Sequence, residues 1–162
     1  TKAMAARYVN SDLLTESPWG DVKVTQTAEG SSLDAVFDGI IPKISNDQDI
    51  PHWSSLPFTN RRQDVNFTFD GPKTVNSISV YWYEDAATEK VLLPRDWWVD
   101  YQDGDGEWKR MDLAADSEYG KEKDQFNIVE PDNPFKATAL RIVTLPVQHH
   151  CQGIHEIQLE LN

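Results

Sequence analysis

The sequence has a single cysteine, Cys151, among its 162 residues. One cysteine cannot form a disulfide within the chain, and it does not indicate a redox compartment. A domain of this length buries roughly two-thirds of the surface that its unfolded chain exposes, which is enough for a core without cross-links. The length therefore predicts one domain that is held together by its own core.

Basic residues are also scarce, since 15 Lys and Arg face 27 Asp and Glu and the formal net charge is −12. Such a surface repels phosphate backbones and anionic lipids, so we expect neither nucleic acid nor a membrane as a partner. Long apolar runs and a signal-peptide pattern are absent from the sequence. The first residue is Thr1, and we interpret the chain as a mature protein or an excised module.

No segment has the periodicity of an amphipathic helix, whereas apolar residues alternate with polar ones in many short segments. The alternation is clear in 22–24, 65–69, 97–101 and 157–161, and we expect a turn at 70–72. Seven or eight strands of this kind predict an all-β sandwich over residues 21–162. Residues 1–20 are weakly patterned, and we interpret them as a linker or extension.

The segment 78–108 is rich in aromatic residues on both faces of its predicted strands. By strand parity, Tyr81, Tyr83 and Trp98 point opposite to Trp82 and Trp97. One set belongs to the core. The other set is either packed beneath loops or forms a flat platform for a ligand such as a sugar ring.

The segment 38–62 has no clear periodicity, and long irregular segments inside a compact domain tend to be functional. Trp53 is the best candidate in it for stacking on a sugar ring. Its polar neighbours could form hydrogen bonds with hydroxyl groups, as could two histidines of a later loop. The candidate carbohydrate-binding residues are His52, Trp53, Asn60, Arg61, Arg62, His149 and His150.

Motifs for catalysis are missing, since neither a Gly-x-Ser-x-Gly sequence nor a glycine-rich phosphate loop occurs. Glu84 and Asp85 are neighbours that would project to opposite faces of a strand, so they are poorly placed to flank one glycosidic bond. Three consecutive residues, 149–151, cannot converge on one zinc ion. The Asp-Gly-Asp-Gly sequence at 103–106 fits a hairpin turn better than a calcium loop.

Several stretches together resemble a known family. They are DGIIPKISNDQDIPHW (38–53), VNFTFDGPKTVNSISVYWYED (65–85), LLPRDWWVDYQDGDGEW (92–108), YGKEKDQFN (119–127), ALRIVTL (139–145) and GIHEIQLEL (153–161). The pattern is similar to the galactose-binding-like jelly roll of family 32 carbohydrate-binding modules and discoidin (coagulation factor V/VIII type C) domains. It most resembles the C-terminal accessory domains of bacterial glycoside hydrolases, such as β-L-arabinofuranosidase-like enzymes and chitobiases.

The resemblance implies a non-catalytic module that binds a glycan or polysaccharide beside a catalytic glycoside hydrolase domain in the same polypeptide. It implies an extracellular or periplasmic location. A module that packs on the catalytic domain without binding sugar is the alternative. The chain departs from the family at Ser55-Leu56, where a Trp pair is common, and in the 146–152 loop.

The same resemblance implies a structural Ca²⁺. Asp38 and Asp47 would bind it from the long segment, Glu156 from the last strand, and carbonyl groups near Ala35 and Ser45 would complete the shell. Calcium takes six to eight oxygen ligands in irregular geometry, so this set is chemically suitable. The alternative is that Asp38 and Asp47 only cap turns.

Overall fold

The computed structural model describes residues 8–9, 15–85, 87 and 90–162. Strands dominate this part of the chain, and its one helix is the short 3₁₀ helix η1 (Leu33–Phe37). No helix among these residues is long and apolar enough to cross a bilayer. The strands are β1 (Tyr8–Val9), β2 (Thr15–Ser17), β3 (Gly20–Val24), β4 (Thr27–Ala28), β5 (Trp53–Ser54), β6 (Gln63–Trp82), β7 (Asp96–Gln102), β8 (Lys109–Arg110), β9 (Phe126–Val129), β10 (Phe135–Leu145) and β11 (Gly153–Leu161).

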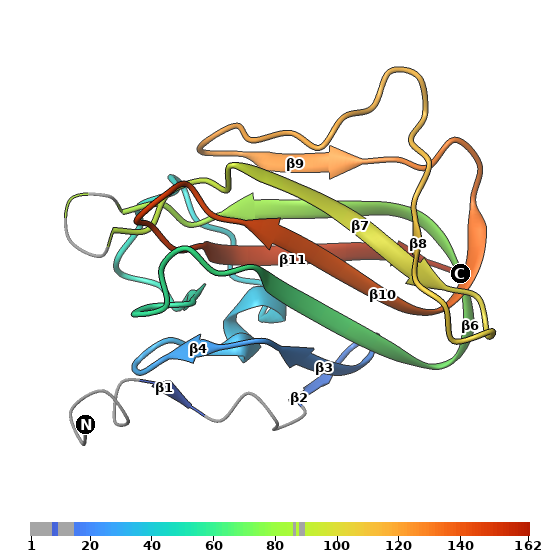
Figure 1. The fold of residues 1–162 in the computed structure, drawn as a ribbon, viewed down its shortest axis with the longest axis horizontal. Coiled ribbons are helices and arrows are strands. Elements are labelled where there is room, and N and C mark those ends of the chain that lie inside the picture. The colour runs from blue at the N-terminus through green and yellow to red at the C-terminus, as the bar shows by residue number, and fades with distance from the viewer. Residues whose placement is uncertain (1–7, 10–14, 86, 88–89) are drawn as a thin grey trace.

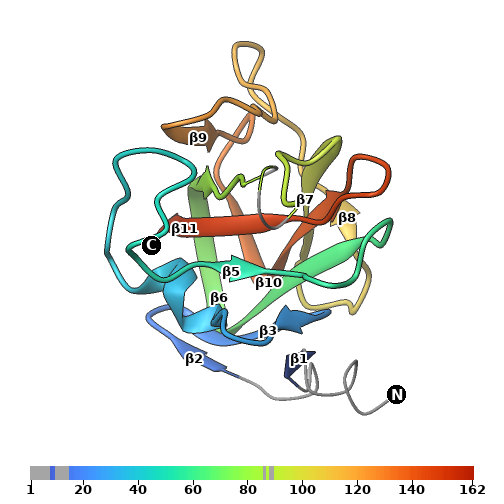
Figure 2. The same cartoon turned by 90° about the vertical axis from the view of Figure 1, so that its left-hand side faces the viewer.

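The 20-residue strand β6 belongs to both layers of the fold (Figure 1). Its first part pairs with β3 and β10, and β10 pairs in turn with β7 to extend this first layer. Its last part pairs with β11 and β9, which form the second layer together with β5. Figure 2 shows β11 and β5 passing in front of β10. The expected all-β sandwich is confirmed.

The predicted turn at 70–72 is wrong, because these residues lie within β6. The register against β10 jumps there: Ala139 pairs with Thr68, but Ala137 pairs with Lys73. Four residues of β6 therefore face the single residue Thr138. An extra loop of this kind in one strand is a bulge, which bends the strand and allows it to pass between layers.

The core lies between the layers and is built from the alternating apolar positions. Trp82 and Trp97 meet edge to face with ring centroids 5.3 Å apart, and both are fully buried. Both indole Nε1 atoms donate to the carbonyl oxygen of Gly120, at 3.4 and 2.9 Å. Burying an indole is stabilising only when its N–H finds an acceptor, so the loop at Gly120 is part of the core.

The two tyrosines that point away from Trp82 are buried. Tyr81 and Tyr83 are 3% and 0% exposed, and the Tyr83 hydroxyl accepts a hydrogen bond from Gln48 Nε2 at 2.8 Å. Tyr83 is therefore packed beneath the long segment, whereas Tyr81 meets the ring of Phe126 in β9 edge-on at 5.4 Å. Neither tyrosine forms a ligand platform. Trp98 stays partly exposed, and the guanidinium of Arg110 lies 4.2 Å from the centre of its ring.

Two further sequence predictions concern the turn at 103–106 and the extension at 1–20. The Asp-Gly-Asp-Gly stretch joins β7 to β8 as a turn, with Gly104 and Gly106 at positive φ, as predicted. Lys109 Nζ is 2.9 and 3.0 Å from carboxylate oxygens of Asp103 and Asp105. Most of the predicted extension 1–20 lies outside the described residues, while β2 within it pairs with β3.

Candidate ligand-binding pocket

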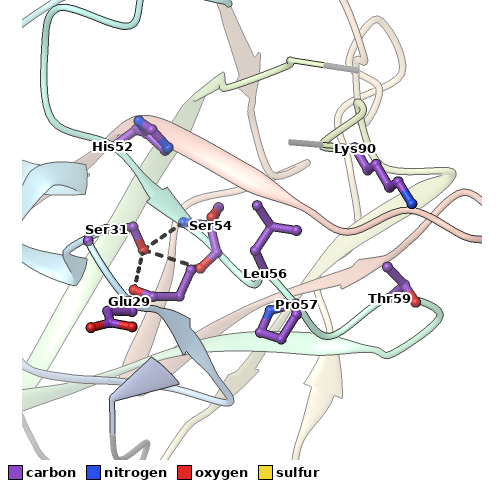
Figure 3. A pocket seen from close by; sticks show the side chains of 10 residues that line it. Glu29, Ser31, His52, Ser54, Leu56, Pro57, Thr59 and Lys90 are labelled. Atoms are coloured by element: carbon purple, nitrogen blue, oxygen red, sulfur yellow. Dashed lines mark hydrogen bonds between the residues drawn. The ribbon is translucent and has the colours of Figure 1, made fainter. Parts of the chain in front are cut away.

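A pocket of about 780 Å³ opens between the turn that follows β4, the chain around β5, and Lys90. Figure 3 shows its side chains. Concave sites of this size are typical of small-ligand binding. The lining residues are Ala28, Glu29, Gly30, Ser31, His52, Ser54, Leu56, Pro57, Thr59 and Lys90.

Ser31 joins the two segments that form one wall. Its Oγ donates to the carbonyl oxygen of Ala28 at 3.0 Å and accepts from the backbone N–H of Ser54 at 3.3 Å. Gly30 has φ of 85°, a value that favours glycine, and so permits the tight turn after β4. These contacts fix the turn against β5, and the wall is preorganised.

His52 is held by stacking rather than by the sheet. Its imidazole lies on the ring of Tyr83, with centroids 3.6 Å apart and planes 8° apart. The ring of His155 meets it edge-on at 5.9 Å. Behind the stack, Gln48 Nε2 donates both to the Tyr83 hydroxyl and to Asp85 Oδ2, each at 2.8 Å. The imidazole is therefore a rigid flat surface at the pocket.

The remaining lining groups give the pocket a mixed chemistry. Leu56 and Pro57 supply apolar surface in its middle (Figure 3). The carboxylate of Glu29, the hydroxyl of Thr59 and the ammonium of Lys90 form no hydrogen bond or ion pair within the described part of the chain. Apolar surface with a few convergent polar groups is the usual composition of a ligand site.

Trp53 does not line this pocket, and its predicted role in stacking is wrong. The side chain is 0% exposed, and its Nε1 donates to the carbonyl oxygen of Gln26 at 3.1 Å and to Thr27 Oγ1 at 3.2 Å. Trp53 faces Ile154 of β11 across the ladder. A ring enclosed in this way is core and cannot contact a ligand.

Asn60, His149 and His150 form a loop contact beside the pocket without lining it. Asn60 has φ of 59°, and its Oδ1 accepts from the backbone N–H of His149. Its own N–H donates to the carbonyl oxygen of His150 at 3.2 Å. The structure thus brings these three predicted residues together, through the Asn60 side chain and backbone groups that connect two loops.

The two predicted arginines are engaged elsewhere. Arg61 lies over the ring of Phe58, with its guanidinium carbon 5.4 Å from the centroid. Arg62 forms a two-pronged ion pair with Asp64, at 2.8 and 3.1 Å, and lies over Trp98. Neither lines the pocket, so His52 is the one predicted binding residue that does.

Sequence reasoning missed Glu29, Thr59 and Lys90. Glu29 and Lys90 lie in short polar connections and Thr59 lies near the end of the long segment, and none of them belongs to a motif. One signal was Ser55-Leu56, where the sequence departs from the pattern that it resembles. Leu56 lines the pocket and Ser55 is buried.

A carboxylate pair lies under the start of the long segment. Glu156 is 2% exposed; its Oε2 accepts from the N–H of Gly39 at 3.0 Å, and its Oε1 has no partner among the described residues. Burial, together with the adjacent Asp38, raises the pKa of Glu156 to about 8. Asp38 Oδ1 also accepts from the N–H of Ile40 at 2.8 Å.

Two of the three predicted calcium ligands, Asp38 and Glu156, therefore lie together. The Oδ1 of Asp47 instead accepts from the N–H of Asp49 at 2.9 Å, as the turn-capping interpretation expects. Across the described ranges, no group of three or more His, Cys, Asp or Glu side chains is placed to hold a metal. A buried carboxylate oxygen without a partner, beside a second carboxylate, nevertheless fits a hard cation if carbonyl groups complete its shell.

Cys151 and His155, two residue types that bind zinc in other proteins, belong to no metal-binding group among the described residues. Cys151 is buried, with Sγ 3.8 Å from the carbonyl oxygen of Lys90. His155 Nε2 lies 3.0 Å from the carbonyl oxygen of Ser45, and burial lowers the pKa of His155 to about 4. A neutral imidazole that donates to a carbonyl oxygen has a structural role.

Comparison with known proteins gives matches at the level of structure. No family model and no curated protein sequence matches the chain. A structure of the Streptococcus pneumoniae β-galactosidase BgaA superposes with a TM-score of 0.68 at 17% identity, covering 92% of this chain and 96% of that one. The family 32 module of Clostridium perfringens NanJ, in complex with galactose, gives 0.63 at 12% identity, covering 94% and 97%.

A third match is a chitosan-binding module from a Paenibacillus chitosanase/glucanase, with a TM-score of 0.60 at 12% identity and coverage of 90% and 96%. These values establish a shared fold over nearly the whole length of each chain. The chain has the galactose-binding-like β-sandwich fold of family 32 carbohydrate-binding modules.

Proposed function

We propose that this chain is a non-catalytic carbohydrate-binding module and that the pocket beside His52 is its binding site. The observation that carries the proposal is the pocket itself, in which a fixed imidazole and an apolar floor face three polar side chains without internal partners. The fold adds support, because structural neighbours bind galactose and chitosan.

In this proposal a sugar ring places an apolar face against Leu56, Pro57 and the imidazole of His52. Its hydroxyl groups exchange hydrogen bonds with Glu29, Thr59 and Lys90. Because His52 is fixed by Tyr83, little conformational entropy is lost on binding. The pocket is open and mostly polar at its ends, so affinity for a single site is modest, and tethering to a second module would raise the effective concentration.

We further propose that the module belongs to a longer secreted or periplasmic polypeptide with a glycoside hydrolase domain. The adjacent carboxylates Glu84 and Asp85 are engaged within the fold: Glu84 binds Lys123 at 2.8 Å, while Asp85 is buried and bonded to Gln48. Its contribution would be to hold the substrate polymer near the catalytic domain.

A purely structural module is the second candidate, and one surface favours it. Ile40, Ile41 and Ile44 are 45%, 47% and 49% exposed on one short loop segment. Clustered exposed isoleucines are unusual on a monomer and are suited to packing against another domain. The two functions predict different behaviour of the pocket, so a binding experiment separates them.

We also propose that a Ca²⁺ binds at Asp38 and Glu156, with loop carbonyl groups as further ligands. When bound, the ion would neutralise two adjacent carboxylates and connect the start of the long segment to β11. Its role would be to stabilise this segment, which also carries Gln48 and His52 toward the pocket.

The decisive experiment is a screen of the isolated chain against a broad set of glycans and polysaccharides, followed by affinity measurements on His52→Ala. His149→Ala is the matched control, because His149 is exposed and does not line the pocket. We expect the first variant to lose binding and the second to keep it. If the wild-type chain binds none of the glycans or polysaccharides in the screen, the binding function is rejected and the structural module is favoured.

A further inference from the structure

The two ends of the pocket carry opposite charges. Among its lining residues, Glu29 is the one carboxylate and Lys90 is the one ammonium group. Figure 3 shows them at opposite ends, with Leu56 and Pro57 between them. A ligand that spans the pocket therefore meets an anion at one end and a cation at the other.

Glu29 is exposed and has no ion pair or hydrogen bond within the described part of the chain. An ionised carboxylate can only accept hydrogen bonds, and its strongest partners are positively charged donors. The backbone around it is fixed, because Ser31 ties the turn after β4 to Ser54. Glu29 is thus an acceptor on a fixed turn, and its carboxylate has no partner among the described residues.

The net charge of the whole chain, like Glu29, favours a positively charged ligand. With a net charge of −12, the surface attracts cations and repels polyanions over roughly a Debye length of 8 Å at physiological salt. An acidic glycan would find only Lys90 to offset this repulsion. A glycan with a free amino group gains from both Glu29 and the surrounding field.

From these observations we infer that the pocket binds amino-sugar oligosaccharides, with an unacetylated ammonium group at Glu29, in preference to acetylated or acidic ones. The inference rests on the proposed function, since it names the class of glycan for the same pocket. The volume of about 780 Å³ exceeds that of one hexose ring several-fold, so the site accepts more than one sugar. Lys90 at the far end would contact ring or glycosidic oxygens of a neighbouring sugar.

The experiment compares glucosamine oligomers with N-acetylglucosamine oligomers and oligouronates of equal length, by calorimetry on the same chain. Wild type should bind the glucosamine oligomer about fivefold more tightly than the acetylated one, the size of one exposed ion pair. Glu29→Gln should abolish that preference, so that the glucosamine oligomer and the acetylated oligomer bind this variant with equal affinity. Its melting temperature should also be unchanged, because Glu29 has no partner to lose.

Glu107→Gln is the matched control, since it removes the same charge from an exposed position on the hairpin between β7 and β8. An equal loss in this variant would mean that the attraction is non-specific, and the inference would be rejected. Equal affinity for both oligomers, or a preference for uronates, would also overturn it while the proposed function stands. If no oligomer or polysaccharide binds at all, the proposed function fails and the inference fails with it.

Discussion

His52 and Tyr83 form a parallel stack, with ring centroids 3.6 Å apart and planes inclined by 8°. Tyr83 directly follows β6 and is fully buried, whereas His52 comes from the long segment and lines the pocket. The stack holds the loop residue His52 in a fixed position against the buried Tyr83. A flat, fixed surface thus exists at the pocket although the neighbouring tryptophan is buried.

The first prediction separates the ring of Tyr83 from its hydroxyl. Tyr83→Phe keeps the stack and loses the hydrogen bond from Gln48, so glycan affinity should stay near that of wild type. Tyr83→Leu removes the flat surface beneath His52, and affinity should fall about tenfold as the imidazole loses its fixed position. Calorimetry below the melting transition measures both. Equal affinities for the two variants would show that the stack does not position His52.

The second prediction concerns Trp53. Trp53→Ala should lower the free energy of unfolding by about 3–5 kcal/mol, because a fully buried indole leaves a large cavity. Trp53→Phe should cost less, since it fills most of the space and loses mainly the hydrogen bonds to Gln26 and Thr27. Chemical denaturation measures both values. A small loss in Trp53→Ala, with glycan binding lost from a folded protein, would contradict the core assignment.

The error over Trp53 has a physical cause. Parity identifies the buried face of a strand only when several residues alternate, and β5 has two residues. The direction of Trp53 is set by pairing with β11, which lies a hundred residues further along the chain. Nothing in the local sequence distinguishes this tryptophan from one that points into a ligand site.

Longer strands were predictable for the opposite reason. In β11 the last residues alternate, and Ile157 is fully buried while Gln158 and Glu160 are exposed, as the pattern indicates. The bend in β6 was not predictable, because Asp-Gly-Pro normally marks a turn and the paired bulge is a property of two strands. The pocket was only partly foreseen, since its walls meet through tertiary contacts between β4, β5 and the chain at Lys90.

The third prediction tests the connection between the loops at 60 and 149. Asn60 has φ of 59° and accepts from the N–H of His149. Asn60→Ala loses the hydrogen bond and gains backbone strain, so it should destabilise the protein by about 1–2 kcal/mol. Asn60→Gly loses the same hydrogen bond without the strain and should cost less. Equal melting temperatures for the two variants would show that the strain is absent.

The fourth prediction concerns Glu156, whose pKa is raised by burial to about 8 from an ordinary value of 4.5. Below pH 4.5 the carboxyl is protonated in both the folded and the unfolded chain. Between 4.5 and 8 the folded chain holds a proton that the unfolded chain has released, so stability falls as the pH rises. From pH 7 to 8 without divalent metal, the free energy of unfolding should fall by about 1 kcal/mol.

The interval from pH 7 to 8 separates the effect of Glu156 from that of His155. The pKa of His155 is lowered to about 4, so its contribution to stability changes only as the pH falls below about 6.5. Calcium that binds at Asp38 and Glu156 would replace the proton, so adding Ca²⁺ at pH 8 should restore the melting temperature that EDTA lowers. Glu156→Gln should remove both the pH dependence and the response to Ca²⁺, because the neutral amide cannot titrate and is a weaker ligand. A wild-type melting temperature that is equal in EDTA and Ca²⁺ would contradict the metal, and an unchanged stability between pH 7 and 8 in EDTA would contradict the protonated carboxyl.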